Sequence, residues 1–415
     1  MSLKISIVLS VFVLFFLCCG VTLTLTSYAQ SEIQTTKHRN MVIDLGNGLE
    51  TNARLNVPAV GDGPFPGVLL VPGSGITDMN TTAGGFVRID NETGALVYPP
   101  ARTFFEIAQY LSERGFAVLQ YDKRGVGANF TILDSNVWGN ITVGNLIQDA
   151  QRALDVLMQQ PEVDPNKISL IGHSEGTTIV PRIAINNSDK VDSIVLMGTR
   201  AQNFQELGNY QSMVPVRYAQ EVLDHDSNGV ISLKEASKDP VFKSLVGDPN
   251  LFVTNNMSAV NGTDKLVDKQ YDKNNDTLIS INDELKPRLI DQLKSLSVVT
   301  PGKKCNYLED QCPIWVRSGY SLEPNLDIIS KVSPNTSVLI QQGENDSQTP
   351  LQEAFLLQQK LTELRHPDHT LVTYPDLGHL FYPSSKWVTN VGGPMERKVL
   401  EDLFEWISDP IRNLK

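Results

Sequence analysis

Short apolar runs alternate with amphipathic helical patterns along two stretches of the chain, and this alternation constrains the fold more than any other feature. A strand that is buried on both faces is typically an apolar run, and a crossover between parallel strands usually contains a helix. The expected strands of this kind lie at 67–73, 116–122, 167–174, 191–199, 336–346 and 369–379. The sequence therefore predicts an α/β fold whose sheet is mostly parallel and is covered by helices on both faces.

The alternation stops after Thr199 and resumes near residue 331. The stretch between is mostly polar, with helical patterns and loops, so we interpret it as a helical cap inserted into the sheet-forming domain. A length of 415 residues suits one large domain with such an insertion. We expect a signal peptide at 1–29, the first part of the core at 30–199, the cap at 200–330 and the second part of the core at 331–415.

A serine between two glycines stands where a predicted strand gives way to a helical pattern. Gly172-His173-Ser174-Glu175-Gly176 fits the pattern G-x-S-x-G. The glycines let the neighbouring backbone pack closely around a strained turn, which presents the serine hydroxyl at the carboxyl end of the sheet. We therefore predict that Ser174 is a catalytic nucleophile.

A serine hydroxyl is a weak nucleophile until a base removes its proton, and the loop after the last predicted strand offers one. His379 lies there beside a glycine, and it is the best placed of the six histidines. The acid is expected after the preceding strand, where we choose Asp346 and keep Glu344 as the near alternative. Asp376 is too close to His379 in sequence to be preferred.

Two backbone N–H groups are expected to stabilise the negative charge that develops on the substrate oxygen. One belongs to Glu175, because it opens the helix after the nucleophile. The other belongs to Ser74, in the sequence VPGSG after an earlier strand, where glycines permit a close approach of the backbone. Asp122 and Arg124 follow the next strand, and we interpret them as members of structural ion pairs.

The motifs LVPGSG, YDKRGVG, IGHSEGT, GENDSQTP and DLGH occur in the order and spacing of the α/β-hydrolase superfamily. The chain most resembles the serine esterases of that superfamily and their S9/S33-type peptidase relatives, over residues 65–200 and 335–415. The resemblance implies an α/β-hydrolase fold with a mostly parallel eight-stranded sheet. It also implies that Ser174, Asp346 and His379 form a catalytic triad.

A segment of the predicted cap, DHDSNGVISLKE at 224–235, fits the twelve-residue calcium loop of an EF-hand. Oxygen ligands stand at positions one, three, five and twelve, position seven offers a carbonyl, and a glycine at position six allows the sharp turn. The expected ligands are Asp224, Asp226, Asn228, Val230 and Glu235. We predict a structural Ca²⁺ ion at this loop.

A second segment, DKNNDTLISIND at 272–283, fits the same pattern less well. Thr277 replaces the glycine, the shorter Asp283 replaces the closing glutamate, and Glu284 is one place late. The candidate ligands are Asp272, Asn274, Asp276, Leu278 and Asp283. We expect weaker or absent calcium binding here, and we expect the two loops to pair through Ile231 and Ile279.

The N-terminus predicts export from the cytoplasm. Lys4 precedes a nearly continuous apolar run, and Ala29 offers a small residue for cleavage, as in a secretory signal peptide. An uncleaved membrane anchor is the alternative, because the apolar run is long for a signal. The protein is therefore expected to be secreted or exposed at the cell surface.

Two further features agree with export. Cys305 and Cys312 are the only cysteines after the predicted signal, and an even pair in an exported chain predicts one disulfide. The chain also has many N-x-S/T sequons, which are potential glycosylation sites. They begin at Asn80, Asn91, Asn129, Asn140, Asn186, Asn256, Asn261, Asn275, Asn335 and Asn345.

The charge of the chain argues against nucleic acid as a partner. The formal net charge is -12, and no cluster of Lys and Arg is visible. Our leading hypothesis is an exported carboxylesterase with a calcium-stabilised cap and no cofactor for catalysis, acting on small or medium acyl esters. A serine peptidase of the S9/S33 type is the first alternative. A catalytically dead, calcium-dependent surface binding protein is the second.

Overall fold

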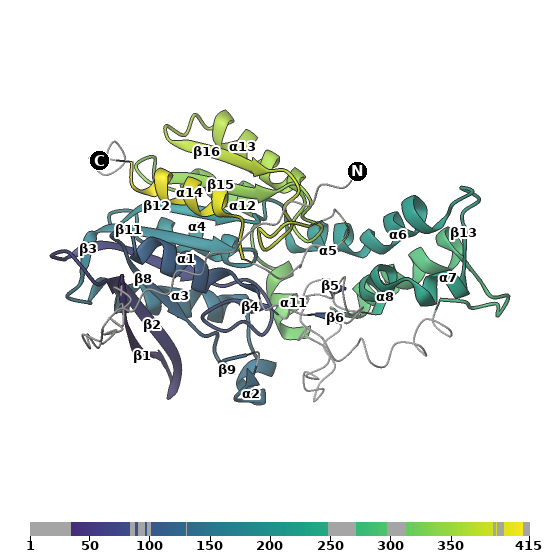
Figure 1. Ribbon diagram of the computed structural model, residues 1–415, viewed down its shortest axis with the longest axis horizontal. Helices are drawn as coiled ribbons and strands as arrows, with labels where there is room; N and C mark the ends of the chain where they lie inside the picture. Colours follow the sequence, from purple (N-terminus) through teal and green to yellow (C-terminus); the bar gives the residue numbers. More distant parts are fainter. Residues whose placement is uncertain are drawn as a thin grey trace, which may run out of the picture. The chain divides into compact units, whose positions relative to one another are not determined.

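The computed structural model describes residues 35–83, 88–89, 96–97, 101–129, 131–247, 271–296, 313–384, 387 and 394–409 (Figure 1). Within these residues, the chain forms an eight-stranded sheet in the order β1-β2-β8-β3-β11-β12-β15-β16. The strands are β1 (Thr36–Gly46), β2 (Leu49–Pro58), β3 (Phe65–Val71), β8 (Ala117–Tyr121), β11 (Val163–His173), β12 (Val191–Met197), β15 (Ser337–Gly343) and β16 (His369–Tyr374).

The sheet is mostly parallel. Only β2 runs against its neighbours β1 and β8, whereas the pairs from β8 through β16 are all parallel. Parallel strands place their carboxyl ends at one edge, so the loops after β3, β11, β15 and β16 meet there. The predicted fold class, an α/β fold with a mostly parallel eight-stranded sheet, is confirmed.

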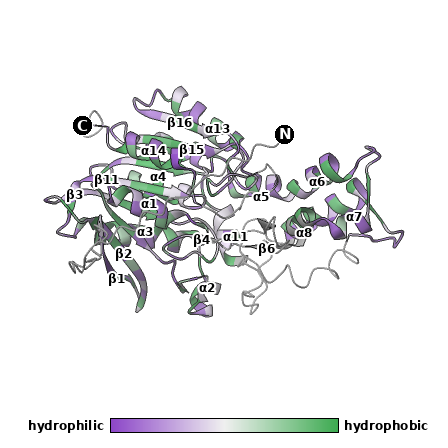
Figure 2. Cartoon of the chain, viewed as in Figure 1, coloured by the Kyte–Doolittle hydropathy of each residue, from purple (hydrophilic) through white to green (hydrophobic). Residues whose placement is uncertain are grey.

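Helices cover both faces of the sheet. One apolar cluster packs α3 (Val143–Met158), α4 (Gly176–Asn186) and α13 (Leu351–Glu363) against one face. A second cluster packs α1 (Thr103–Ser112) and α14 (Arg397–Ile407) against the other face. Successive residues of a strand point to opposite faces, and accordingly Leu70 and Val71 belong to different clusters. Figure 2 shows hydrophobic residues concentrated in the strands and in α4.

Local sequence signals explain where some of these helices begin. Thr142 caps α3: its hydroxyl accepts a hydrogen bond from the Asn145 backbone N–H, and the Asn145 side chain accepts one from the Thr142 N–H. Such a reciprocal cap satisfies two backbone donors that the first turn leaves unpaired. Asp134 caps the short helix α2 (Ser135–Gly139) in a similar way.

Short two-stranded ladders lie between the main strands. They are β4 (Thr82–Ala83) with β7 (Ala101–Arg102), β5 (Arg88–Ile89) with β6 (Leu96–Val97), and β9 (Val126–Gly127) with β10 (Thr131–Ile132). The first two belong to the connection between β3 and α1 and the third to the connection between β8 and α3. The sequence patterns did not predict them, because strands this short carry no periodic signal.

The longest connection joins β12 to β15, which are neighbours in the sheet. It contains α5 (Phe204–Ser212), α6 (Val214–Tyr218), η1 (Ala219–Leu223), β13 (Val230–Ser232), α7 (Leu233–Lys238), α8 (Pro240–Gly247), β14 (Leu278–Ser280), η4 (Ile281–Leu285), α10 (Lys286–Leu296), α11 (Pro313–Tyr320), α12 (Asn325–Ile328) and η5 (Ile329–Lys331). Part of it has its own apolar cluster, with Phe242, Tyr271 and Leu285 fully buried. A segment with its own core can fold around that core without interrupting the sheet.

Candidate active site

Ser174 stands at a strained turn between β11 and α4. Its φ is 53°, in the left-handed region that residues other than glycine rarely adopt. Its backbone N–H donates a hydrogen bond to the Met197 carbonyl at 2.9 Å. A Cβ atom on Gly176 would lie 2.2 Å from the Val71 carbonyl oxygen, and one on Gly172 would lie 2.5 Å from the Gly176 carbonyl. Both glycines of the motif are therefore required by contact with neighbouring backbone.

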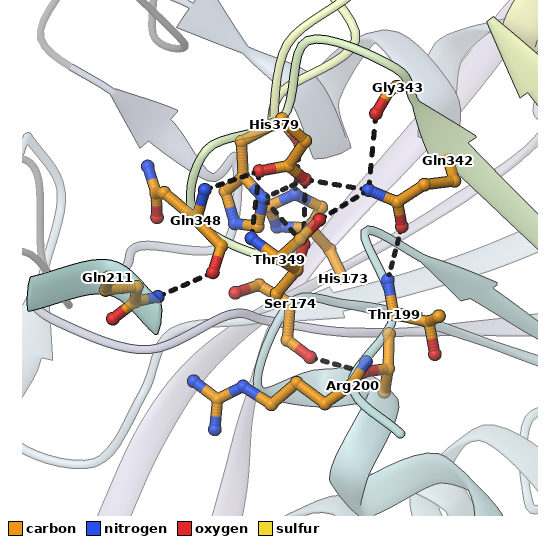
Figure 3. Close-up of polar contacts among 12 residues, drawn as sticks. His173, Ser174, Thr199, Arg200, Gln211, Gln342, Gly343, Gln348, Thr349 and His379 are labelled. Carbon is orange, nitrogen blue, oxygen red and sulfur yellow. Dashed lines mark hydrogen bonds and ion pairs between the residues drawn. The ribbon is translucent and has the colours of Figure 1, made fainter. Parts of the chain in front are cut away.

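Asp346 and His379 are joined at the carboxyl ends of β15 and β16. His379 is labelled in Figure 3, and its Nδ1 lies 2.7 Å from Asp346 Oδ2. The same carboxylate accepts hydrogen bonds from the Gln342 side chain at 3.0 Å and the Thr349 hydroxyl at 2.7 Å. It also accepts them from the backbone N–H groups of Gln348 and Thr349, at 2.8 and 2.9 Å. Asp346 is thus held in one orientation by five donors.

These contacts set the protonation of the pair. Burial alone raises the pKa of Asp346, but His379 and the hydrogen bonds outweigh it and lower the pKa below the ordinary 3.8. An ionised carboxylate only accepts hydrogen bonds, so His379 carries a proton on Nδ1 and donates it to Asp346. In the neutral ring, Nε2 then keeps its lone pair and can accept a proton.

His173 brings the serine turn and the histidine loop together. Its Nε2 lies 2.9 Å from the carbonyl oxygen of His379, and the centroids of the two rings are 4.7 Å apart. Burial lowers the pKa of His173 to about 3, with a further contribution from His379, so His173 is neutral and donates from Nε2. Ser174 and His379 are only 5% and 4% exposed. Among the described residues no hydrogen bond joins the Ser174 hydroxyl to His379, and such contacts often tighten only when substrate binds.

The other carboxylates near this loop lie apart from His379. Glu344 is exposed and accepts a hydrogen bond from the Thr373 hydroxyl at 2.8 Å. Asp376 is also exposed. Of the three acids that the sequence offered, the structure places Asp346 against the imidazole ring.

The glycine-rich loop after β3 packs against the serine turn. A Cβ on Gly73 would lie 3.2 Å from the Cβ of Ser174, so the backbone next to Ser74 closely approaches the nucleophile turn. Ser74 is half-buried, and its carbonyl accepts a hydrogen bond from the Thr77 hydroxyl at 3.0 Å. Glu175 is the N-cap residue of α4 on the other side of Ser174. Both predicted oxyanion residues therefore flank Ser174.

Comparisons with known proteins give partial matches to two families. Residues 100–224 match the family described as serine aminopeptidase, S33, and residues 297–408 match the prolyl oligopeptidase family. These matches include the serine turn, the acid loop and the histidine loop, and the sheet has the strand arrangement that the sequence resemblance implied. The chain has the α/β-hydrolase fold.

Individual relatives of this α/β hydrolase are distant or partial. Esterase EstD from Thermotoga maritima is 32% identical over 162 residues, which are 39% of this chain and 32% of the length of that relative. Est1E from Butyrivibrio proteoclasticus has a TM-score of 0.45 and 14% identity, covering 91% of this chain and 99% of its own. Proline iminopeptidase from Mycobacterium smegmatis has a TM-score of 0.49 and 13% identity, with the same two coverages.

Neither family match includes residues 225–296, where most of the first calcium-type loop and all of the second lie.

In the first loop, both carboxylate oxygens of Asp224 accept backbone hydrogen bonds, from Asn228 at 3.0 Å and from Gly229 at 2.9 Å. Asn228 Oδ1 accepts one from the Val230 N–H at 2.8 Å. Glu235 instead accepts a hydrogen bond from the Ser232 hydroxyl at 2.7 Å, at the start of α7. The backbone thus wraps around the acidic end of the loop.

The second loop is closed by Glu284, which lies one place after the position that the twelve-residue pattern predicts for the closing ligand. Glu284 is only 7% exposed, and its carboxylate accepts hydrogen bonds from the N–H groups of Lys273 and Ser280, both at 2.8 Å. Asp283, the predicted closing ligand, bonds the Ser280 hydroxyl at 3.2 Å instead. Both acids lie in the π-helical turn η4, whose wider turn accommodates one extra residue. The signal was Glu284 itself, one place after the expected position.

The two loops pair as expected. β13 and β14 form a short antiparallel ladder in which Ile231 lies opposite Ile279, and both side chains are buried. Thr277 has a φ of 69°, at the sharp turn where the first loop has Gly229 with a φ of 83°. Among the described residues, no three His, Cys, Asp or Glu side chains are gathered in a cluster that could hold a metal ion. The donor set of the first loop fits calcium in type, because it combines carboxylate, amide and carbonyl oxygens.

A buried charged network behind Glu175 was missed by the sequence analysis. Lys123 Nζ lies 2.8 Å from one carboxylate oxygen of Glu175, and Trp315 Nε1 lies 2.6 Å from the other.

Arg124 pairs with Asp149, as expected for a structural residue. Asp122 differs from the expectation: it accepts hydrogen bonds from the Met79 N–H and the Asn52 side chain, and no ion pair of Asp122 is found in the described part of the chain. The half-buried backbone N–H of Met79 takes the place of a cation as the partner of this carboxylate.

Several sequence predictions fall outside the described residues. The signal at 1–29 and the cysteines Cys305 and Cys312 belong to this group. Across the described ranges, no helix has the length and apolar character needed to cross a membrane.

Proposed function

We propose that this α/β hydrolase is a serine hydrolase that cleaves carboxylic esters through an acyl-enzyme intermediate. The observation that carries the proposal is the 2.7 Å contact between Asp346 and His379 at the same sheet edge as the left-handed Ser174 turn. A structural serine needs neither a strained backbone nor a buried acid–imidazole pair beside it.

The reaction would proceed in two balanced steps. His379 Nε2 takes the Ser174 proton while Oγ attacks the ester carbonyl, and the N–H groups of Glu175 and Ser74 hold the resulting oxyanion. His379 then gives its proton to the leaving alcohol, which leaves an acyl group on Ser174. Water, deprotonated by His379, releases the carboxylic acid and restores the serine. Asp346 orients the ring and stabilises its charged form.

The partial likeness to an esterase supports an ester as the substrate, and the matches to the S33 and prolyl oligopeptidase families favour a peptide bond as the second candidate. The test compares p-nitrophenyl butyrate with aminoacyl and prolyl p-nitroanilides. We expect the ester to be turned over with the higher kcat/KM. A preference for the anilides would move the function to the peptidase. If Ser174→Ala retains more than about a tenth of the activity, the nucleophile lies elsewhere.

We also propose that the segment with the paired loops is stabilised by Ca²⁺ held by Asp224, Asp226, Asn228, the Val230 carbonyl and Glu235. The donor set and the Ile231–Ile279 ladder support this. In the second loop the carboxylate of Glu284 already bridges two backbone donors, so we expect the first loop to be the stronger site. Isothermal titration with CaCl2 should give one dominant site; two equal sites would contradict the ranking.

Export is part of the same proposal. The N-terminal sequence supports cleavage after Ala29, with an uncleaved anchor as the alternative. Intact-mass analysis of the protein from its native host separates the two, because cleavage leaves Gln30 at the N-terminus. Free-thiol titration of the denatured, unreduced mature protein, which lacks Cys18 and Cys19, should find almost none if Cys305 and Cys312 are bonded. Two free thiols per chain would refute the disulfide.

A further inference from the structure

Arg200 lies next to the nucleophile turn, three residues after the end of β12. Its backbone N–H donates to the Thr177 hydroxyl at 3.1 Å, and that hydroxyl donates to the Ser174 carbonyl at 2.6 Å (Figure 3). The Arg200 carbonyl accepts a hydrogen bond from the Asn325 side chain at 2.6 Å. The backbone of Arg200 is therefore fixed to the turn on one side and to α12 on the other.

The side chain of Arg200 is buried, and one of its nitrogen donors lacks an acceptor. The residue is only 6% exposed, and its Nε has no hydrogen-bond partner. No described residue forms an ion pair with it within 4.0 Å, and its Cζ lies 5.1 Å from the centroid of the Phe204 ring. Burying an N–H donor without an acceptor is unfavourable, and Nε of Arg200 is such a donor.

The neighbouring carboxylates are already occupied. Glu175 is bonded by Lys123 and Trp315. Glu353 accepts the backbone N–H groups of Ala201 and Gln202, at 2.7 and 2.8 Å. Burial lowers the pKa of Arg200, and the negative charges of Glu175 and Glu353 partly offset this effect. Neither carboxylate accepts a hydrogen bond from the Arg200 side chain.

Arg200 lines a recess in the surface, together with Glu175 and Thr178 from the segment that follows Ser174. Apolar residues from α3, α5 and the segment before α12 form part of its lining, namely Val143, Phe204, Leu322 and Pro324. Polar residues that also line it include Thr178, Gln202, Asn203 and Asn325. Glu323 also borders the recess, but its side chain is 65% exposed and lies 3.3 Å from Lys331. The recess therefore combines the cation of Arg200 with a lining that is partly apolar and partly polar.

We propose that Arg200 binds a carboxylate carried by the substrate, so that this α/β hydrolase prefers esters with an anionic group on an apolar or aromatic body. The planar guanidinium group matches the two oxygens of a carboxylate, and such a ligand would give the unpaired Nε donor of Arg200 an acceptor. This inference rests on the proposed function, because it assigns specificity to the site around Ser174. The carboxylate belongs either to the acyl group or to the leaving alcohol.

Two matched pairs of esters distinguish these sources. Mono-p-nitrophenyl glutarate against p-nitrophenyl pentanoate places the charge on the acyl side. The pair 4-butyryloxybenzoate and 4-butyryloxybenzamide places it on the leaving group. For one of the two pairs, we expect the wild-type ratio of kcat/KM to favour the anionic ester.

Arg200→Gln should lower that ratio about 10- to 100-fold, as expected for the loss of a hydrogen bond to a charged group. Arg200→Lys keeps the positive charge but not the planar guanidinium group. Its ratio of kcat/KM values should therefore fall between those of the wild type and Arg200→Gln. It also provides a second variant if the uncharged one folds poorly. The melting temperature of each variant separates a change in specificity from a loss of structure.

The results separate this inference from the proposed function. If the wild type hydrolyses the neutral esters but neither pair shows a preference that Arg200→Gln reduces, the carboxylate site is wrong and the esterase proposal stands. If neither neutral nor anionic esters are hydrolysed, the esterase proposal fails and the carboxylate specificity fails with it.

Discussion

Replacing Lys123 by Met tests whether the buried ion pair behind the nucleophile turn is required for stability. The two side chains are 3% and 1% exposed, with Nζ 2.8 Å from the Glu175 oxygen. In Lys123→Met the carboxylate of Glu175 keeps the Trp315 donor but loses its counter-charge. Removing one partner of a buried pair typically costs about 3–5 kcal/mol, because the remaining charge stays desolvated.

That free energy converts into a measurable shift in melting temperature. With an unfolding entropy of about 2.1 cal/mol/K per residue over roughly 380 residues, a loss of 3–5 kcal/mol lowers Tm by about 4–6 °C. Burial already lowers the pKa of Lys123, even though Glu175 opposes that change, so part of this cost is present in the wild type. Circular dichroism at 222 nm during heating measures Tm, and urea unfolding at constant temperature provides an independent value.

Two comparison variants make the result specific. Lys331→Met removes the exposed partner of Glu323 and should change Tm by about 1 °C or less, because exposed ion pairs contribute little. The double variant Lys123→Met with Glu175→Gln removes both charges and should recover much of the lost stability. A Tm of Lys123→Met within about 1 °C of the wild type would refute the reasoning, as would a double variant less stable than the single one.

The remaining predictions concern the acid and the calcium loop. Asp346→Asn should lower kcat on p-nitrophenyl butyrate by about 10⁴-fold, because an amide favours the wrong histidine tautomer, whereas Glu344→Gln should stay within about threefold of the wild type; the reverse order would move the acid to Glu344. The pKa of Asp346 is lower in the folded protein than its ordinary 3.8, so its stabilising effect is complete above that value and is lost as pH falls through the folded pKa. Asp346→Asn should therefore lose less stability than the wild type in urea titrations from about pH 5 to pH 2, and an equal loss would contradict this. EDTA should lower Tm by a few degrees and Glu235→Gln should copy that shift, with Glu363→Gln on α13 as an unaffected control. A loss of turnover in EDTA at unchanged Tm would instead place calcium in the active site.

The sheet and the serine turn could be predicted because their sequence signals are local. Apolar runs and helical periodicity mark the parallel strands, and the contacts of Gly172 and Gly176 leave no room for a side chain. Asp346 and His379 could be placed because parallel strands end at one edge, so residues after two neighbouring strands meet. The pairing of Ile231 with Ile279 followed in the same way from the symmetry of two similar loops.

The rest depends on contacts between distant segments or on small changes in helical geometry. Lys123, Glu175 and Trp315 meet across 52 and 140 residues of sequence, and no local pattern predicts that. Arg200 reads as an ordinary charged residue after a strand, and only its burial reveals the missing partner. Glu284 turns into the second loop through a π-helical turn, which shifts the twelve-residue spacing by one place.

Covalent labelling with a fluorophosphonate tests the central claim most directly. The reagent reacts with a serine only where a base and an oxyanion site activate it. After labelling of the wild-type protein, tandem mass spectrometry of the peptide that contains Ser174 should find the phosphonyl group on that residue. Ser174→Ala should remain unlabelled, and Asp346→Asn should react far more slowly. A wild-type protein that is folded but does not react, or that carries the label on another residue, would contradict the account.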